Sequence, residues 1–320
     1  MAEKKQIAFA LLKILQEETD ENHIMPAGVL MDKLNRQLNL DIERRTLYAN
    51  IELLRQAGYE VSDYADNRKG YYLAGRQFEK GEVLLLCNAI HASHFIDQKQ
   101  SSELIEKLLK TLSFHQQKEF RESVYMPNRL KTDSKSLFYN IEIISEAIRD
   151  RKKLQFTYMH YNSRKKLTPK RAEPYIVEPR YIVYQDSRPY LICTNPHYSN
   201  FIHYRIDKIR NPLILEEQVR SLTRAGETEA YRYAENKLFM FAGDVIPVTY
   251  KCQDRIMDQM IDIFGTSLKV QQGEDGYFFA HIRTTENGAL FLAQQFLDAI
   301  EIVDPENVKE KMKERLRAIQ

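Results

Sequence analysis

Two neighbouring segments decide the fold of this chain: SRPYLIC at residues 187–193 and FIHYRIDKIR at residues 201–210. The first is a β-rich apolar run and predicts a strand. The second alternates, so a strand here would place His203, Arg205 and Asp207 on one face. Charged residues are seldom buried unpaired, and the guanidinium of Arg205 offers a planar fork of donors. This pattern favours an anion-binding site in which Asp207 braces Arg205.

The same segments resemble the WYL domain, a small Sm/SH3-like β-barrel of bacterial transcription regulators. The resemblance rests on Tyr190-Leu191 and on HYRIDKI at residues 203–209. It also rests on two upstream runs, LQFTY at residues 154–158 and LTPKRAEPY at residues 167–175. Pro189 replaces the tryptophan that gives the family its name, and the chain has no tryptophan at all.

The resemblance implies a barrel over residues 151–217 that senses a nucleotide or a short oligonucleotide. The residues that it places toward the ligand are Tyr158, Arg171, Tyr190, His203 and Arg205. Aromatic rings interleaved with arginines suit such a ligand, because rings stack on bases and cations bind phosphates. The alternative is that the tyrosines are barrel core and that Arg205 and Asp207 form a structural pair.

Composition sets the limits on domain number and on the partners. With 320 residues, 43% of them hydrophobic, the chain can hold two or three cores. Its net charge of +2 indicates no particular partner. Basic residues nevertheless crowd residues 149–171, where Asp150 is the single acid. That local field could attract phosphate, or it could be an ordinary solvated surface.

The three cysteines, Cys87, Cys193 and Cys252, lie far apart in or beside apolar runs and predict buried, reduced thiols. Cys87 could be read with His91, His94 and Asp97 as a metal site at helical spacing, but a core thiol fits the apolar stripe better. We therefore expect no metal and no cofactor. No run is long enough to span a bilayer and no signal peptide is evident, so we expect a soluble, cytoplasmic protein.

Residues 1–76 predict a winged helix-turn-helix. Its third helix would run over residues 42–55 with Asp41 as N-cap, and Leu47, Ile51 and Leu54 would face the core. A hairpin with a basic tip would follow. The stretch RTLYANIELL at residues 45–54 is similar to recognition helices of the DeoR-like winged helices that precede WYL domains. The DNA-binding residues that follow from this are Arg44, Arg45, Thr46, Tyr48, Ala49, Arg68 and Lys69.

A protein-interaction module is the alternative for this segment, because acidic residues slightly outnumber basic ones over residues 1–75. If the segment does bind DNA, this charge balance means that a monomer would bind weakly, because affinity depends on neutralising phosphates. A dimer on two half-sites would bind better.

The rest of the chain predicts an α+β multidomain protein. Residues 77–150 would be a helical linker, and residues 218–244 a second linker with a helix over 228–239. Residues 245–320 follow the order strand, helix, two strands, helix, strand, which suggests a ferredoxin-like unit. This resembles the extension that follows WYL domains, the WCX domain, which in that family helps a homodimer form.

Taken together, these features predict a ligand-responsive regulator that binds a double-stranded DNA operator, responds to an anionic nucleotide or oligonucleotide, and acts as a repressor. A nucleic-acid-processing enzyme is one alternative. The sequence shows neither a carboxylate cluster for two metals nor a glycine-rich phosphate loop, so we predict no enzyme activity. An Sm-like RNA-binding protein is the other alternative.

Overall fold

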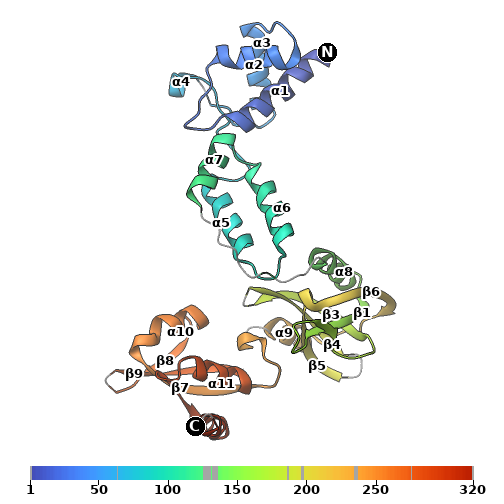
Figure 1. Ribbon diagram of the computed structural model, residues 1–320, viewed down its shortest axis with the longest axis vertical. Coiled ribbons are helices and arrows are strands. Elements are labelled where there is room, and N and C mark those ends of the chain that lie inside the picture. Colours follow the sequence, from blue (N-terminus) through green and yellow to red (C-terminus); the bar gives the residue numbers. More distant parts are fainter. Residues whose placement is uncertain are drawn as a thin grey trace. The chain divides into compact units, whose positions relative to one another are not determined.

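The computed structural model describes residues 2–62, 64–124, 131, 136–185, 187–195, 198–233, 237–274 and 276–318. The chain divides into two compact units, residues 1–135 and 136–320. The described part of the first is mainly helical, and the second holds helices and two antiparallel sheets (Figure 1). The chain is therefore of mixed α+β class, as predicted. The finer division into five segments stays a prediction.

The first unit begins with three helices around one apolar core: α1 (Ala2–Glu18), α2 (Ala27–Leu38) and α3 (Arg44–Gln56). Leu47, Ile51 and Leu54 of α3 are buried, as their spacing predicted. Gly58 follows the helix in a left-handed conformation with φ +90°, where glycine carries no steric penalty.

The start of α3 differs from the prediction. Asp41 is not its N-cap; that position is Glu43, and the helix begins at Arg44. Ile42 explains the shift, because its side chain is buried in the core. Its backbone N–H donates to the Asn35 side-chain oxygen at 2.8 Å, so an extra-helical partner already satisfies this amide.

Among the described residues, isolated bridges pair the segments around the predicted hairpin. Met25 pairs with Tyr71, and Val61 pairs with Leu73. The predicted turn begins with a short helix, α4 (Tyr64–Asn67). The Asn67 side chain then accepts from the backbone N–H groups of Lys69 and Gly70. The winged-helix assignment stays a prediction.

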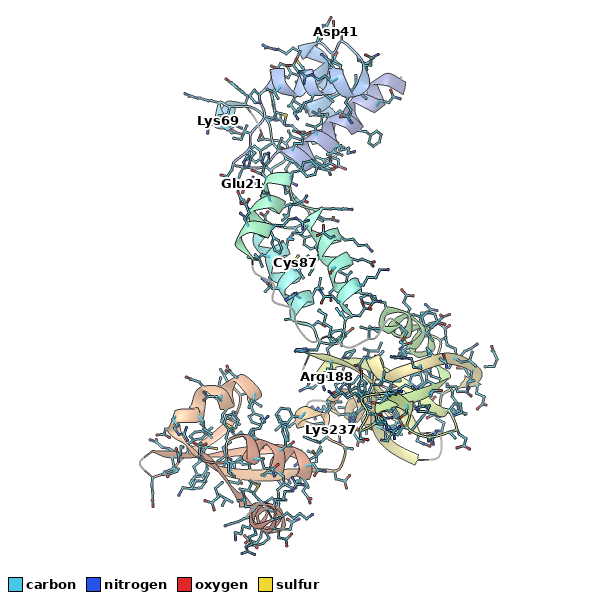
Figure 2. The ribbon with its side chains drawn as sticks, viewed as in Figure 1. Glu21, Asp41, Lys69, Cys87, Arg188 and Lys237 are labelled. Atoms are coloured by element: carbon cyan, nitrogen blue, oxygen red, sulfur yellow. The ribbon has the colours of Figure 1, made fainter. Side chains whose placement is uncertain are left out.

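Three further helices complete the first unit: α5 (Lys80–Ala92), α6 (Gln98–Leu109) and α7 (Phe114–Ser123). Cys87 is buried among apolar side chains of α5, α6 and α7 (Figure 2). Asp97 caps α6 by accepting from the Gln100 N–H at 2.9 Å. Over the described residues no three His, Cys, Asp or Glu side chains gather as metal ligands.

The second unit opens with α8 (Leu137–Arg149) and an antiparallel sheet in the order β2-β1-β3-β4-β5, with β6 also paired to β1. Its strands are β1 (Lys152–Tyr161), β2 (Leu167–Pro169), β3 (Tyr175–Gln185), β4 (Arg188–Asn195), β5 (Tyr198–Arg205) and β6 (Ile209–Gln218). The predicted strand over residues 201–210 is thus wrong in its second half. It ends at Arg205, and a 3-10 turn, η1 (Ile206–Lys208), separates β5 from β6.

A buried amide from α8 explains this turn. The Asn140 side chain donates to the carbonyl oxygens of Ile206 at 3.2 Å and Ile209 at 2.9 Å. Both ends of η1 are therefore held by one side chain that is fully buried. Closure of the sheet into an Sm/SH3-like barrel stays a prediction.

The linker helix also differs from the prediction of residues 228–239. The helix is α9 (Arg224–Arg232), capped by the Thr223 hydroxyl. Residues Leu238–Met240 form a 3-10 turn, η2, in which Phe239 and Met240 have φ values of 55° and 53°. Left-handed backbone at two successive residues that are not glycine cannot continue an α-helix.

The C-terminal part forms a four-stranded antiparallel sheet in the order β10-β7-β9-β8. Its elements are β7 (Val245–Gln253), η3 (Asp254–Ile256), α10 (Met257–Phe264), β8 (Lys269–Gln272), β9 (Tyr277–Thr285), α11 (Glu286–Gln295), β10 (Ile300–Asp304) and α12 (Glu306–Arg317). The predicted order of strands and helices is present, and Tyr250, Ala289 and Ile302 lie in its core. Within the described chain no helix combines the length and apolar character that a membrane span requires.

Candidate ligand cavity and nucleic-acid face

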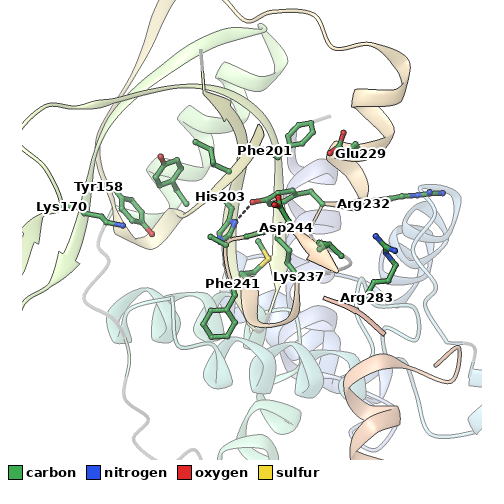
Figure 3. Close-up of a pocket in the computed structure, with 17 residues that line it drawn as sticks. Tyr158, Lys170, Phe201, His203, Glu229, Arg232, Lys237, Phe241, Asp244 and Arg283 are labelled. Atoms are coloured by element: carbon green, nitrogen blue, oxygen red, sulfur yellow. Dashed lines mark hydrogen bonds between the residues drawn. The ribbon is translucent and has the colours of Figure 1, made fainter. Parts of the chain in front are cut away.

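A cavity of about 1100 Å³ lies in the second unit (Figure 3). Part of its wall comes from β1 and β5, and part comes from α9 and the segment that follows it. Its aromatic lining is Tyr158, Phe201, Tyr204, Tyr233 and Phe241. Its charged lining is Lys170, Glu229, Arg232, Lys237, Asp244 and Arg283. Rings and a modest excess of cations therefore face one open space.

His203 lies on the cavity wall and connects the sheet to the linker. Its Nδ1 lies 3.0 Å from the Tyr233 hydroxyl, and the ring also makes a hydrogen bond to the Met240 backbone. Burial lowers the pKa of His203, outweighing that backbone bond. A neutral ring suits both partners, since one nitrogen can donate to the backbone while Nδ1 accepts from the hydroxyl.

Lys237 is a buried cation in the same wall, with only 4% of its surface exposed. Its ammonium donates to the Gly243 carbonyl oxygen at 2.6 Å and lies 4.5 Å from the centre of the Tyr233 ring. Burial lowers its pKa, and the nearby charge of Asp244 opposes that shift. No ion pair is formed by Lys237 within the described residues.

Tyr158 belongs to an aromatic cluster beside the cavity. Its ring packs edge-on against Phe156, Tyr175 and Tyr204, with centroid separations of 6.4, 6.1 and 5.0 Å. Burial raises the pKa of Tyr158 to about 12. Its hydroxyl accepts from the Arg205 backbone N–H at 3.2 Å, so it is neutral and serves as an acceptor at physiological pH.

Arg205 does not line the cavity. Its guanidinium forms a bidentate pair with Asp207, with Nε–Oδ1 and Nη2–Oδ2 distances of 3.0 and 2.6 Å. The Asp207 side chain is 2% exposed and that of Arg205 is 18% exposed. The predicted bracing by Asp207 is therefore present, but it occupies the fork that was expected to face a ligand.

Other cations lie close to Arg205. Burial lowers the pKa of Lys208, and the charges of Arg205, Arg188 and Lys170 lower it further, while Asp207 opposes them. Lys170 also lines the cavity. A positively charged patch of four side chains therefore adjoins the cavity: Lys170, Arg188, Arg205 and Lys208.

The two remaining predicted ligand residues lie outside the cavity lining. Arg171 is exposed and packs over the Tyr175 ring at 3.6 Å, while its guanidinium donates to the carbonyl oxygens of Glu173 and Pro174. Tyr190 is buried with Ile192 and Met240. Of the five predicted residues, the structure brings Tyr158 and His203 to the cavity.

The linker contributes residues that the sequence pattern did not single out. Tyr233, Lys237 and Phe241 belong to a segment read as a polar helical linker. The run KLFMFAGD at residues 237–244 was the available signal, because it interrupts that polarity with aromatic residues.

A shallow hollow of about 470 Å³ lies on the exposed face of α3. Arg45, Thr46 and Ala49 border it, together with Asn50, Glu52, Leu53 and Gln56. Arg44, Arg45, Tyr48 and Ala49 are exposed, as are Arg68 and Lys69 on the segment after α4. Lys69 is labelled in Figure 2. The predicted DNA-binding residues thus lie at the surface of the first unit, and their contact with DNA stays a prediction.

Comparison with known proteins assigns one part of the chain. Residues 139–213 match the family model of the WYL domain, so this segment is a WYL domain. No curated protein matches the chain significantly. Proteasome accessory factor B/C (PafBC) of Arthrobacter aurescens is a structural neighbour at 13% identity and TM-score 0.29, covering 97% of this chain and 47% of that one. The chain therefore spans about half of the length of PafBC. A CRISPR Cas-related protein aligns at 14% identity and TM-score 0.41, covering 74% of this chain and 71% of that one.

Proposed function

We propose that the chain is a ligand-responsive DNA-binding transcription regulator, acting as a repressor and as a homodimer. Its WYL domain would sense a nucleotide or short single-stranded nucleic acid, and it would have no enzyme activity. The observation that carries the proposal is the cavity between the WYL domain and its linker, where aromatic rings and cations meet. Stacking surfaces with nearby positive charge are the features that single-stranded nucleic acid requires.

The DNA-reading part of the proposal rests on α3. Leu47, Ile51 and Leu54 anchor one side of the helix in the core, which leaves Arg45 and Tyr48 exposed on another. Ala49, one turn after Arg45 on the same side of the helix, is small enough for close approach to a groove. Arg44, Arg68 and Lys69 supply charge for phosphates, which fix the position of a protein on DNA.

Occupancy of the cavity must favour one arrangement of the DNA-bound dimer over another. A coupling free energy of about 1–3 kcal/mol is usual for such a switch. The ligand must supply this difference through contacts that it makes better in one arrangement.

Footprinting on the DNA upstream of the chain's own gene tests this function. We expect protection of an inverted repeat, and we expect short anionic oligonucleotides to change it. Arg45→Ala combined with Tyr48→Ala should weaken binding by about tenfold or more, a typical cost for base and phosphate contacts. Arg36→Ala is the matched control, because it removes an exposed charge from α2 in the same unit.

Three outcomes would count against the proposal. DNA affinity unchanged in the double variant would exclude α3 as the reading element. Absence of any protected repeat, together with binding to RNA, would favour an Sm-like RNA-binding protein. Loss or cleavage of the nucleic acid would favour an enzyme.

A further inference from the structure

We propose that Lys237 is the anion anchor of the cavity and holds the terminal phosphate monoester of a nucleotide or oligonucleotide ligand. This rests on the proposed ligand sensing and adds the charged group that would recognise the phosphate. Lys237 lies in the linker, outside residues 139–213 that match the WYL domain.

The first argument is the burial of an ammonium that forms no ion pair with any described residue. Lysine is rarely buried unless it is paired, and an ammonium has three N–H donors. Among the described residues, Lys237 donates to the Gly243 carbonyl, and its ammonium lies over the Tyr233 ring. The nearby Asp244 carboxylate acts on Lys237 through its charge but forms no ion pair with it. A phosphate oxygen would therefore provide a charged acceptor in direct contact with the ammonium.

The second argument is that the protein holds Lys237 at the cavity by several contacts. Tyr233, on one side of it in sequence, bonds to His203 of β5. Met240, on the other side, is buried against Tyr190 and Ile192 of β4. Left-handed backbone at Phe239 and Met240 persists only where the surroundings enforce it, so the segment is built into this position.

The third argument is that the arginine expected to bind the anion is already engaged. The Arg205 fork is closed on Asp207, both of whose carboxylate oxygens it contacts. Lys237 lines the cavity (Figure 3), and no described carboxylate forms an ion pair with it. Around it, Tyr233 and Phe241 offer rings for a base.

Equilibrium binding of two probes to the full chain tests the inference: a 5′-phosphorylated deoxydinucleotide and the same dinucleotide with a 5′-hydroxyl. We expect the wild-type chain to prefer the phosphorylated probe by about tenfold to a hundredfold, as a charge-assisted hydrogen bond would provide. In Lys237→Met the ratio of the affinities for the phosphorylated and unphosphorylated probes should fall to nearly one. If Lys237 only braced the linker, its removal would weaken the binding of both probes equally. The ratio of the two affinities would then stay unchanged.

Lys251→Met is the matched control. Lys251 also lies 4.5 Å from the centre of a tyrosine ring, that of Tyr277, but it does not line the cavity. It should keep the wild-type preference. Thermal unfolding of each variant checks that the comparison is made on folded protein, and Lys237→Arg, which keeps the charge, should retain part of the preference.

The outcomes separate the two proposals. Wild-type binding with an unchanged ratio in Lys237→Met overturns the anchor and leaves ligand sensing intact. A wild-type chain that binds both probes equally also overturns the anchor alone. Failure of the wild-type chain to bind either probe, together with a DNA footprint that no oligonucleotide alters, overturns ligand sensing and the anchor with it.

Discussion

Glu178 is a fully buried carboxylate at the point where β3 and β4 pair. Arg180 and Arg220 contact its oxygens at 3.1 and 3.0 Å, and the Thr194 hydroxyl donates to it at 2.9 Å. Burial alone would raise its pKa, but the hydrogen bonds from Arg220 and Thr194 and the positive charge outweigh burial and lower the pKa below 4.5. This side chain is therefore charged and stabilising at neutral pH.

Glu178→Gln should lower the free energy of unfolding of the second unit by about 3 kcal/mol at pH 7, because it leaves buried positive charge without its partner. A depressed carboxyl pKa contributes stability above the unfolded pKa and loses it as pH falls through the folded pKa. The difference between wild type and variant should thus shrink progressively below pH 4.5. Urea unfolding followed by circular dichroism at pH 7 and pH 4 measures both values. An equal difference at the two pH values would contradict this account.

Arg205→Ala should destabilise the second unit by about 3 kcal/mol, since it leaves the buried Asp207 carboxylate without the guanidinium. Adding Asp207→Asn should recover at least half of the loss, because the buried charge is then gone. Urea unfolding of the single and double variants gives this coupling. If Arg205→Ala instead kept full stability and lost only ligand affinity, the fork would belong to the ligand, as the sequence pattern suggested.

Single residues could be predicted where chemistry is local to a sequence pattern. Alternation and resemblance led to Tyr158 and His203, which line the cavity. Lys237 could not be found in this way, because nothing in its neighbourhood of the sequence says that folding brings it beside His203. The pairing of Arg205 with Asp207 was foreseen, but its consequence, an occupied fork, depends on the turn that follows.

At the scale of elements, a single glycine sets the approach of two chain segments in the first unit. A Cβ on Gly70 would lie 2.2 Å from the Met25 carbonyl oxygen and 2.8 Å from the Pro26 nitrogen. These are backbone atoms of the segment that pairs with Tyr71, so no side chain can rotate to relieve the clash.

Gly70→Ala should therefore lower the stability of the first unit by about 1–3 kcal/mol, the usual cost of overpacking. Gly81→Ala is the matched control. A Cβ there meets nothing within 4 Å, and alanine favours the helix by up to about 1 kcal/mol. Hydrogen exchange of the amides around residues 25 and 71 measures the local effect. Equal protection in the two variants would mean that this approach does not matter for stability.

Elements with strong apolar spacing were predictable, and those fixed by distant partners were not. Helical spacing placed Leu47, Ile51 and Leu54 of α3 correctly in the core. The break between β5 and β6 depends on Asn140, which lies 66 and 69 residues from the two carbonyl groups that it binds. The alternating pattern within residues 201–210 could not predict these hydrogen bonds from Asn140.

At the scale of the whole molecule, hydrogen bonds across long sequence separations join helices that lie far apart in the chain. Asp20 accepts from the Ser113 hydroxyl at 2.5 Å, over 93 residues. Arg76 donates to the carbonyl oxygens of Gln16 and Thr111. These bonds join the first three helices to α6 and α7, which is why residues 1–135 form one compact unit. The predicted boundary near residue 76 came from local patterns and the resemblance, and such patterns contain no information on these distant pairs.

Salt dependence would show whether the proposed regulator binds DNA as a dimer. If Arg44, Arg45, Arg68 and Lys69 each neutralise one phosphate, a monomer should give a slope of log K against log salt near −4, and a dimer on two half-sites about −7. Gel shifts over a salt series measure the slope. Arg68→Ala with Lys69→Ala should reduce its magnitude by about two per protomer, while Arg36→Ala on α2 should leave it unchanged. A slope near −4 with one chain per DNA molecule would exclude the dimer. An unchanged slope in the variant with Arg68→Ala and Lys69→Ala would show that these two residues do not contact DNA.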